Sequence, residues 1–391
     1  MKLLIGGSPC TYWSIAQTKN RETKPEGLGW ELFKNYLIAL EKFKPDFFLY
    51  ENNKSMNCSI REQITKELGA EPILINSALV SAQTRQRLYW TNIPGVEQPE
   101  DRGILLRDIL EKPSVGDGGA FKTSGKSLTL REMEYMVRET SKGRNHFDFD
   151  YHHDGTKKKS ACVTANTHCG VPYNVLAEPV NVKTGSDTSV QAAGPIRVCN
   201  IDGGKQGNRI YTTDAKSCAV KAQGGGLGGH GQGLYAIPTD EKTCPVYEVL
   251  NGQITVRGKQ YPIKLSDGFY IIRKLTVLEC KRLQTVPDDY IFPVSNTQAY
   301  KMLGNGWTCD VISHILSYCP GITKETLSVL SMYDGMSCGR IALNKLGAHI
   351  TRYYATEIDK YAIQASQTNF PDIIHMGDAF QVRRNDWKLL E

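Results

Sequence analysis

The sequence lacks C-x-x-C pairs, although it contains 11 cysteines in 391 residues. A structural zinc site is therefore not predicted, and a chain of this length does not need a disulfide framework to fold. Long apolar runs are also missing, because runs such as Phe47 to Tyr50 are far too short to cross a bilayer. The start, Met1 to Gly7, has no apolar segment typical of a signal peptide. We expect reduced thiols, a cytoplasmic protein and no membrane partner.

Charge of either sign shows little excess. The 47 Lys and Arg residues against 41 Asp and Glu residues give a formal net charge of +6. This small positive balance permits a polyanionic partner without requiring one. The length is sufficient for one large core and a second module.

The first hundred residues alternate between short apolar runs and one helical pattern. Strands are predicted at Lys2–Ile5, Phe47–Tyr50, Ile73–Ile75 and Leu88–Thr91, and a helix over Trp30–Phe43. Regular structure is also predicted from residue 271 onward. It comprises a capping box at Thr276–Glu279, helices at Asn296–Leu303 and Ile341–Leu346, strands at Leu327–Met332 and Ile350–Ala355, and an Asp359 helix cap. This alternation is typical of a doubly wound α/β sheet.

The segment between about residues 111 and 268 has a different composition. Glycine is dense there, above all from Gly203 to Gly233, and helical periodicity is weak. A short repeat relates Lys159–Ala165 to Lys216–Ala222. Two copies are too few for a solenoid, so we expect a smaller β-rich or loop-rich module.

Residues near the C-terminus suit an adenosine-containing ligand. A predicted strand ends in the turn Tyr333–Gly339, the next strand ends at Glu357, and Asp378 follows a third short strand, Ile373–His375. A tight turn lets a ligand approach the backbone, and an acid about 20 residues later can bind ribose hydroxyls. The turn lacks G-x-G-x-x-G spacing, which disfavours NAD and a dehydrogenase. The alternative is that these are ordinary turn residues.

Residues near the N-terminus suit nucleophilic chemistry. Cys10 follows the first predicted strand, and Glu51 ends the next one. Adjacent parallel strands would bring both side chains to one edge of the sheet. Arg85 and Arg87, two residues apart in a predicted strand, would point the same way. The alternatives are that Cys10 is a structural cysteine, that Glu51 is a solvated strand terminus, and that the two arginines belong to a surface stripe of ion pairs.

Taken together, six motifs resemble those of DNA cytosine-5 methyltransferases, in a style similar to the eukaryotic de novo enzymes and their bacterial and phage relatives. They are Gly-Gly-Ser-Pro-Cys at 6–10, Glu-Asn-Asn at 51–53, Gln-x-Arg-x-Arg at 83–87, the segment Arg273–Pro287, Gly-Asn-Gly-Trp at 304–307, and Asp-Gly-x-x-x-Gly at 334–339 with its later acids. The resemblance covers roughly residues 1–110 and 270–391. It implies a Rossmann-like α/β methyltransferase sheet, S-adenosylmethionine as cofactor and double-stranded DNA as partner. The oligomeric state is left open, and a monomer on DNA is compatible with the resemblance.

The resemblance also implies a role for each matching residue. Cys10 would attack C6 of a flipped cytosine, Glu51 would bind its N3 and N4 edge, and Arg87, supported by Arg85, would hold O2 and a nearby phosphate. The residues implied for cofactor binding are Pro9, Tyr333, Asp334, Gly335, Met336, Ser337, Cys338, Glu357, Ile358, Asp378, Ala379, Asn305 and Trp307. The sulfonium would lie near the Tyr333 ring. No metal is implied.

Two features depart from the family pattern. The cofactor segment follows the nucleophile segment along the chain, which indicates a circular permutation. The resemblance therefore implies a nucleophile half at 1–110, a target recognition domain at 111–270 and a cofactor half at 271–391. Asn53 and Thr11 also differ from the usual residues. The alternatives are a catalytically inactive DNA-binding relative and an RNA cytosine-5 methyltransferase.

Overall fold

The computed structural model describes residues 1–14, 21–111, 114–115, 121–122, 194–200, 209–222, 233–238, 247–256 and 259–385. The first copy of the short repeat and most of the glycine-dense segment lie outside these residues. Within the described residues, no helix combines the length and the apolar character needed to span a membrane.

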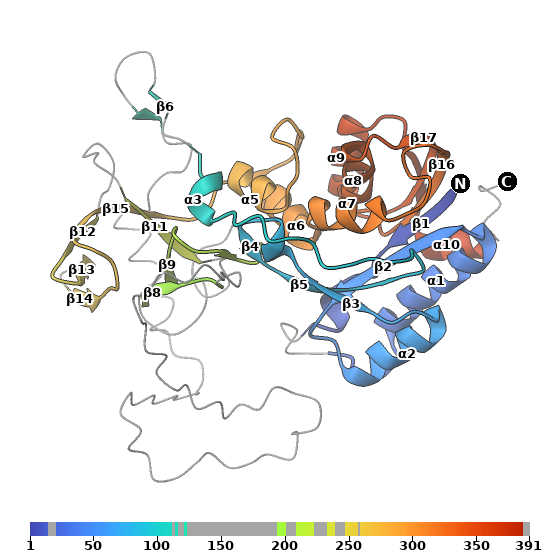
Figure 1. Cartoon of the computed structure of the whole chain (residues 1–391), viewed down its shortest axis with the longest axis horizontal. Coiled ribbons are helices and arrows are strands. Elements are labelled where there is room, and N and C mark those ends of the chain that lie inside the picture. The colour runs from blue at the N-terminus through green and yellow to red at the C-terminus, as the bar shows by residue number, and fades with distance from the viewer. Residues whose placement is uncertain are drawn as a thin grey trace, which may run out of the picture.

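A seven-stranded sheet forms the larger part of the molecule (Figure 1). Its strand order is β18-β17-β16-β1-β2-β5-β3, and only β5 runs against the others. The strands are β1 (Lys2–Gly6), β2 (Phe47–Asn53), β3 (Ile73–Asn76), β5 (Gln86–Thr91), β16 (Thr326–Met332), β17 (His349–Thr356) and β18 (Ile374–Gly377). This confirms the predicted doubly wound α/β sheet.

The first strand of the chain pairs directly with a strand from its last quarter. Leu4 of β1 lies beside Leu330 of β16 in parallel register. Counted from β16, the sheet has the order 3-2-1-4-5-7-6, so the direction of winding reverses between β16 and β1. Loops leaving two such strands diverge and leave a crevice, which is where ligands bind in open α/β sheets.

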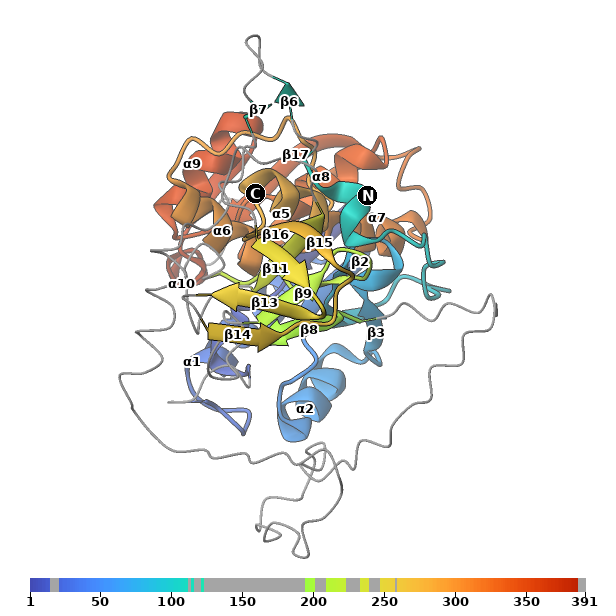
Figure 2. The same ribbon diagram turned by 90° about the vertical axis from the view of Figure 1, so that its left-hand side faces the viewer.

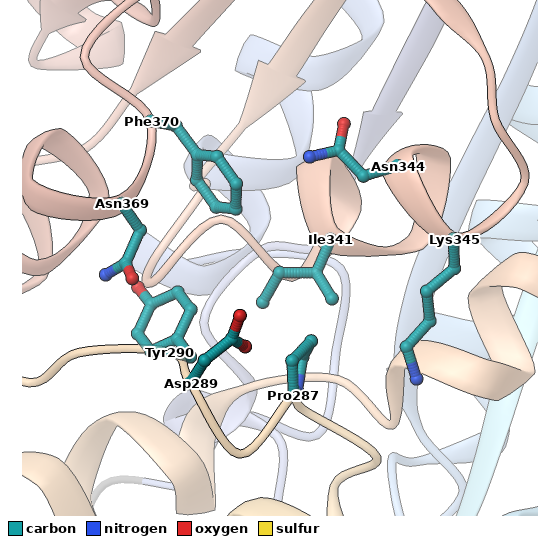
Figure 3. Close-up of a pocket in the computed structure, with 8 residues that line it drawn as sticks. All are labelled: Pro287, Asp289, Tyr290, Ile341, Asn344, Lys345, Asn369 and Phe370. Carbon is teal, nitrogen blue, oxygen red and sulfur yellow. The ribbon is translucent and has the colours of Figure 1, made fainter.

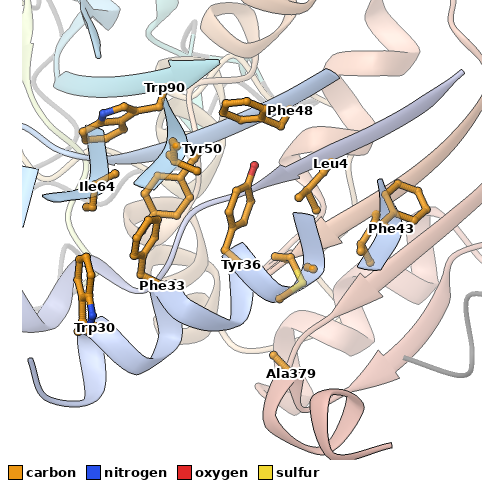
Figure 4. Packing of buried hydrophobic residues seen from close by; sticks show 14 of the residues in the cluster. Leu4, Trp30, Phe33, Tyr36, Phe43, Phe48, Tyr50, Ile64, Trp90 and Ala379 are labelled. Carbon is orange, nitrogen blue, oxygen red and sulfur yellow. The ribbon is translucent and has the colours of Figure 1, made fainter. Parts of the chain in front are cut away.

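Helices cover both faces of this sheet. On one face, α1 (Leu28–Phe43), α2 (Cys58–Leu68) and α10 (Ala379–Arg384) pack on Leu4, Phe48 and Tyr50 (Figure 4). On the other, α7 (Cys309–Ser317) and α8 (Cys338–Lys345) pack on Leu3 and Ile5. Successive residues of β1 thus serve opposite cores, as alternation along a strand requires. Helix α9 (Lys360–Asn369) joins a third apolar cluster with α5 (Val277–Leu283) and α6 (Asn296–Asn305).

A second seven-stranded sheet lies to one side of the first (Figures 1 and 2). Its order is β14-β13-β12-β15-β11-β9-β8, mostly antiparallel, around its own apolar cluster. The strands are β8 (Arg197–Asn200), β9 (Arg209–Thr212), β11 (Leu234–Pro238), β12 (Tyr247–Leu250), β13 (Gln253–Val256), β14 (Lys259–Pro262) and β15 (Gly268–Arg273). Because β15 extends to Arg273, this sheet runs slightly past the expected boundary at 270. The β-rich character of the module is confirmed for its described part.

Short elements connect the two sheets. Strand β10 (Ser217–Cys218) pairs with β4 (Gln83–Thr84), and α3 (Leu106–Ile109) lies between the sheets with α5 and α6 (Figure 1). The remaining short elements are η1 (Cys10–Tyr12), η2 (Ser77–Leu79) and the hairpin of β6 (Ser114–Val115) and β7 (Phe121–Lys122). The segment that carries β10 is therefore hydrogen-bonded to the segment that precedes β5 of the central sheet.

Most local predictions agree with the structure. The Thr276–Glu279 capping box opens α5, Asp359 caps α9, and Gly347 follows α8 with a φ of 70°. The prediction of one strand through both arginines is wrong, because the strand is interrupted at Arg85, which lies between β4 and β5. Helix α6 continues through Asn305, beyond the expected end at Leu303. Helices α2 and α7 were not predicted.

Candidate active site

The loop after β1 places Cys10 at the carboxyl edge of the central sheet. Its position is fixed by buried hydrogen bonds to the end of β2. The Ser8 hydroxyl lies 2.6 Å from the Tyr50 hydroxyl, and Asn52 Nδ2 donates to the Ser8 carbonyl at 3.1 Å. Pro9 is exposed and precedes the single turn η1, which begins at Cys10. Asn52 therefore holds the Cys10 loop from the neighbouring strand.

Glu51 lies next to this loop, as the parallel pairing of β1 and β2 requires. A methyl group added at Gly7 would lie only 2.6 Å from the Glu51 carbonyl oxygen, so the two backbones are in close contact. The residue is 9% exposed, and both oxygens of its side chain have partners. Arg87 Nε lies 2.9 Å from Oε1, and the Trp307 indole Nε1 donates to Oε2 at 2.9 Å.

Cys10 lies within the electrostatic field of this carboxylate and the two arginines. Burial raises the pKa of the Cys10 thiol, the positive charge of Arg87 lowers it, Glu51 raises it and Arg85 lowers it, and the net direction is upward. Removal from water disfavours the thiolate more than the cations favour it. The resting protein thus holds a protonated thiol whose ionisation depends on Arg87.

Arg85 has different partners from Arg87, in contrast to the expectation of a shared strand face, because β4 ends before it and β5 begins after it. Its side chain is 5% exposed and donates to backbone carbonyls of Val220, Gly304 and Gly306 at 2.9–3.0 Å. Burial lowers the pKa of Arg85 to about 10. The guanidinium thus joins the segment around Val220 to the Gly-Asn-Gly-Trp segment.

Sequence reasoning missed a buried polar cluster beneath this loop. Gln83 Nε2 donates to the Leu283 carbonyl and to Gln284 Oε1, and the Thr308 hydroxyl donates to the same Gln284 oxygen. Gln83 Oε1 also accepts from the Val220 amide. The amide side chains at 83 and 284 lie in two of the recognised motifs, and this position within motifs was the available signal. Their role is to hold three separate segments together.

The turn after β16 forms the second half of the site. Tyr333, Gly335 and Ser337 all have positive φ, of 60°, 59° and 64°. The Gly335 amide donates to Glu357 Oε2 at 2.8 Å, so the acid ending β17 already lies against the turn. Asp334 is buried and accepts hydrogen bonds from the hydroxyls of Ser337 and Tyr353. Burial raises the pKa of Asp334 to about 6, against the lowering effect of nearby hydroxyl groups.

The surroundings of this turn fit an adenosine-containing group. Space within 4 Å of a methyl group added at Gly335 is open, and the apolar Ile358 side chain is 75% exposed beside Glu357. Asp378 Oδ1 caps α10 by accepting from the Phe380 amide, which sets the position of its carboxylate. Asn305, the last residue of α6, is exposed. Carboxylates for hydroxyl and amino groups and an apolar side chain for a base are thus grouped at one edge of the sheet.

Several expected cofactor residues contribute no side chain to this surface. Met336, Cys338 and Ala379 are buried in apolar clusters, so their side chains are not available at this surface. The Tyr333 hydroxyl donates to the Leu32 carbonyl at 2.7 Å, which fixes its half-buried ring against α1.

A separate pocket of about 350 Å³ lies between α8, the end of α9 and the loop after α5 (Figure 3). Its lining takes Ile341, Asn344 and Lys345 from α8, whereas the turn after β16 precedes the first residue of that helix. The pocket is therefore distinct from the cluster around Cys10 and Glu51. Its lining residues are Pro287, Asp289, Tyr290, Ile341, Asn344, Lys345, Asn369 and Phe370.

Comparison with known proteins gives a consistent set of relatives. The family model for C-5 cytosine-specific DNA methylase matches residues 1–320. The orphan methyltransferase M.SPRI of Bacillus phage SPR is 23% identical over 381 residues, covering 80% of this chain and 81% of that protein. The type II methyltransferase M.FnuDI of Fusobacterium nucleatum is 23% identical over 333 residues, covering 83% of this chain and 77% of that protein. The solved structure of the methyltransferase EhMeth of Entamoeba histolytica superposes on this chain with a TM-score of 0.44 and 12% identity, covering 81% of this chain and 76% of that chain.

Proposed function

Since this chain belongs to the C-5 cytosine-specific DNA methylase family, we propose that it methylates C5 of a cytosine in a specific sequence of double-stranded DNA through a covalent bond to Cys10. The observation that carries this proposal is the pairing of β1 with β16, which sets the Cys10 loop beside the cofactor turn. S-adenosylmethionine would supply the electrophilic methyl group. The open turn at Gly335 and the acids Glu357 and Asp378 support its binding there.

Cytosine C5 is a poor nucleophile, and Cys10 would activate it. The thiolate would add to C6 and turn the ring into an enamine, and the C5 of that enamine would then be nucleophilic enough to accept the methyl group. Glu51 would bind the N3 and N4 edge and stabilise the proton that N3 gains as charge develops. Loss of the C5 proton restores the double bond and expels the Cys10 thiolate. Arg87 would favour the thiolate and hold the base O2, since its Nε is already paired with Glu51.

We assign the roles of the cofactor residues by their placement. Glu357 would accept from the ribose hydroxyls and Asp378 from the adenine amino group, with Ile358 packing on the base. Pro9, Tyr333, Asp334, Gly335 and Ser337 would shape the pocket, and Met336, Cys338 and Ala379 would contribute backbone contacts. Asn305 would close the site from the facing loop. Arg85 would act indirectly, by holding that loop.

The second sheet is proposed as part of the target recognition domain. A stacked base is out of reach of Cys10, so the target cytosine must be flipped out of the duplex. The division into residues 1–110, 111–270 and 271–391 accounts for two sheets joined through β4 and β10. Base-edge contacts from the second sheet would set the recognised sequence. The bacterial and phage sources of the relatives support action in a bacterial cytoplasm.

The chain order supports a circular permutation of the family arrangement. The nucleophile strand β1 precedes the cofactor strand β16 in sequence, although they are neighbours in space. The family model ends at residue 320, just before β16. Helix α10, which follows the cofactor strands, packs on α1 through Ala379 and Val382. Placing the cofactor strands first would leave every strand pairing unchanged.

The experiment that tests this function compares wild-type protein with Cys10→Ala on duplex DNA. Wild-type protein should transfer labelled methyl groups, and bisulfite sequencing should map them to one sequence. Cys10→Ala should transfer none while retaining cofactor binding. DNA with 5-fluorocytosine at the mapped position should form a covalent adduct with wild-type protein alone, because fluorine cannot leave as the C5 proton does. Methyl transfer by Cys10→Ala, or transfer to RNA in preference to DNA, would overturn the proposal.

A further inference from the structure

The structure assigns Trp307 a role in the methylation reaction: we infer that its indole N–H positions the Glu51 carboxylate for the target base. This goes beyond the cofactor contact that the resemblance implied for Trp307, and it rests on the proposed function. The basis is one contact between distant segments, in which Trp307 Nε1 donates to Glu51 Oε2 at 2.9 Å.

Glu51 is held at both oxygens by different donors. Arg87 Nε lies 2.9 Å from Oε1, while the indole serves Oε2. A carboxylate can rotate about its last bond unless both oxygens are bonded, and catalytic groups need fixed orientation. Each oxygen still has a second lone pair, so the clamp leaves acceptor sites for the N4 amino group and N3 of cytosine. The two donors together therefore set the plane in which the base is read.

The indole is itself fixed by its surroundings. Its ring packs against two apolar clusters, one on the α7 face of the sheet and one around α5, α6 and α9. The loop before it is bound through the Gly306 carbonyl, which accepts from Arg85 at 2.9 Å. Thr308, directly after it, is buried and donates to Gln284. The indole is thus held by the bonded residues before and after it and by the packing of its ring. A donor fixed in this way can orient the Glu51 carboxylate.

The same loop touches the cofactor turn. A methyl group added at Gly306 would lie 3.1 Å from Cys338 Sγ, at the start of α8. Trp307 thus connects the two halves of the site, with the cofactor turn on one side and the base-binding acid on the other. The indole N–H donates to the Glu51 carboxylate, so removal of this N–H should affect the chemical step more than the affinity for the cofactor.

Trp307→Phe tests this role, because it keeps a ring and removes the N–H. At saturating S-adenosylmethionine and duplex DNA, we expect the single-turnover rate of methyl transfer to fall about tenfold to a hundredfold, the loss typical of a hydrogen bond to a charged group. The dissociation constant for S-adenosylmethionine, measured by calorimetry, should change less than about threefold. In a Glu51→Gln background the same substitution should cost far less, because the carboxylate it orients is gone.

Trp90→Phe is the matched control. Its indole also donates one hydrogen bond, to the Thr65 hydroxyl at 2.9 Å, but within the core beside α2. This variant should keep the wild-type transfer rate even if its unfolding midpoint falls. Three results would overturn the inference: an unchanged rate in Trp307→Phe, a loss confined to S-adenosylmethionine affinity, or equal losses with and without Glu51. Absence of methyl transfer in the wild-type protein would instead refute the proposed function, and the inference with it.

Discussion

Arg85 donates a hydrogen bond to the carbonyl oxygen of Val220, 135 residues away, at 3.0 Å. Its other terminal nitrogen donates to the carbonyls of Gly304 and Gly306. A buried guanidinium that satisfies three backbone carbonyls joins the segments around residues 85, 220 and 304–306 at one point. The second arginine of Gln-x-Arg-x-Arg therefore contacts Glu51, whereas the first organises the site.

Replacing Arg85 by Lys tests this structural role. A single ammonium group cannot reach all three carbonyls, and each buried carbonyl left unpaired costs about 1–3 kcal/mol. We expect the free energy of unfolding in urea to fall by about 2–4 kcal/mol. S-adenosylmethionine affinity should also weaken, because the Gly-Asn-Gly-Trp loop loses its anchor.

The matched control is Arg107→Lys, whose side chain is 56% exposed and paired with Asp214 on the surface. It should change stability by less than about 0.5 kcal/mol. If Arg85→Lys kept wild-type stability while losing methyl transfer alone, a direct contact with the base would be the better explanation.

Gly304 is expected to tolerate no side chain. A methyl group there would lie 2.0 Å from the Ala222 amide nitrogen and 2.1 Å from the Lys221 carbonyl carbon, both backbone atoms. Gly304→Ala must therefore push α6 away from the 221–222 segment, and a destabilisation above about 2 kcal/mol is expected. Gly194→Ala, at a position where the added methyl group meets nothing within 4 Å, should be neutral. Equal unfolding midpoints for the two variants would contradict the close contact.

Much of the central sheet could be predicted from short patterns. The apolar runs at Lys2–Ile5 and Leu327–Met332 and the capping box at Thr276 depend on local physics, and the structure reproduces them. The adjacency of Cys10 and Glu51 followed from a general rule about parallel strand ends, and the pairing of β1 with β2 confirms that rule here.

What the sequence could not supply were the contacts between distant segments. The local sequence does not distinguish the contacts of Arg85 from those of Arg87. These contacts depend on the interruption between β4 and β5 and on carbonyl groups contributed by residues 220, 304 and 306. Similarly, the bond from Trp307 to Glu51 spans 256 positions. Helix α7 was also not predicted. Its N-cap residue is Thr308, but the Thr308 hydroxyl donates to Gln284 and makes no hydrogen bond to the helix backbone.

Asp334 should make stability depend on pH in an unusual direction. Its pKa of about 6 in the folded protein lies above the ordinary value of 3.8, so folding favours the protonated form. The free-energy cost of ionising Asp334 in the folded protein is fully present well above pH 6. It declines as the pH falls towards 3.8, the pKa of the group in the unfolded chain. Relative to Asp334→Asn, the wild-type protein should therefore gain about 1–1.5 kcal/mol of unfolding free energy between about pH 8 and about pH 5. Urea unfolding of both proteins at both pH values measures this difference, and a constant difference would contradict the burial of an ionisable carboxyl group.

The reactivity of Cys10 should depend on Arg87 through charge. Burial raises the pKa of the Cys10 thiol, and Arg87 is the strongest influence in the opposite direction. Alkylation by iodoacetamide requires the thiolate, so its rate at Cys10 should still be rising above about pH 9 in the wild-type protein. Arg87→Met removes the positive charge and releases the Glu51 carboxylate, which itself raises the pKa of the thiol. Both effects act in the same direction, and the whole profile should move to higher pH.

Mass spectrometry can follow alkylation at each cysteine in the same sample, with Cys58, the first residue of α2, as an internal control whose rate should be the same in both proteins. Coincident Cys10 profiles for wild-type protein and Arg87→Met would mean that Arg87 does not promote thiolate formation. Its part in the reaction would then reduce to holding Glu51 and the base.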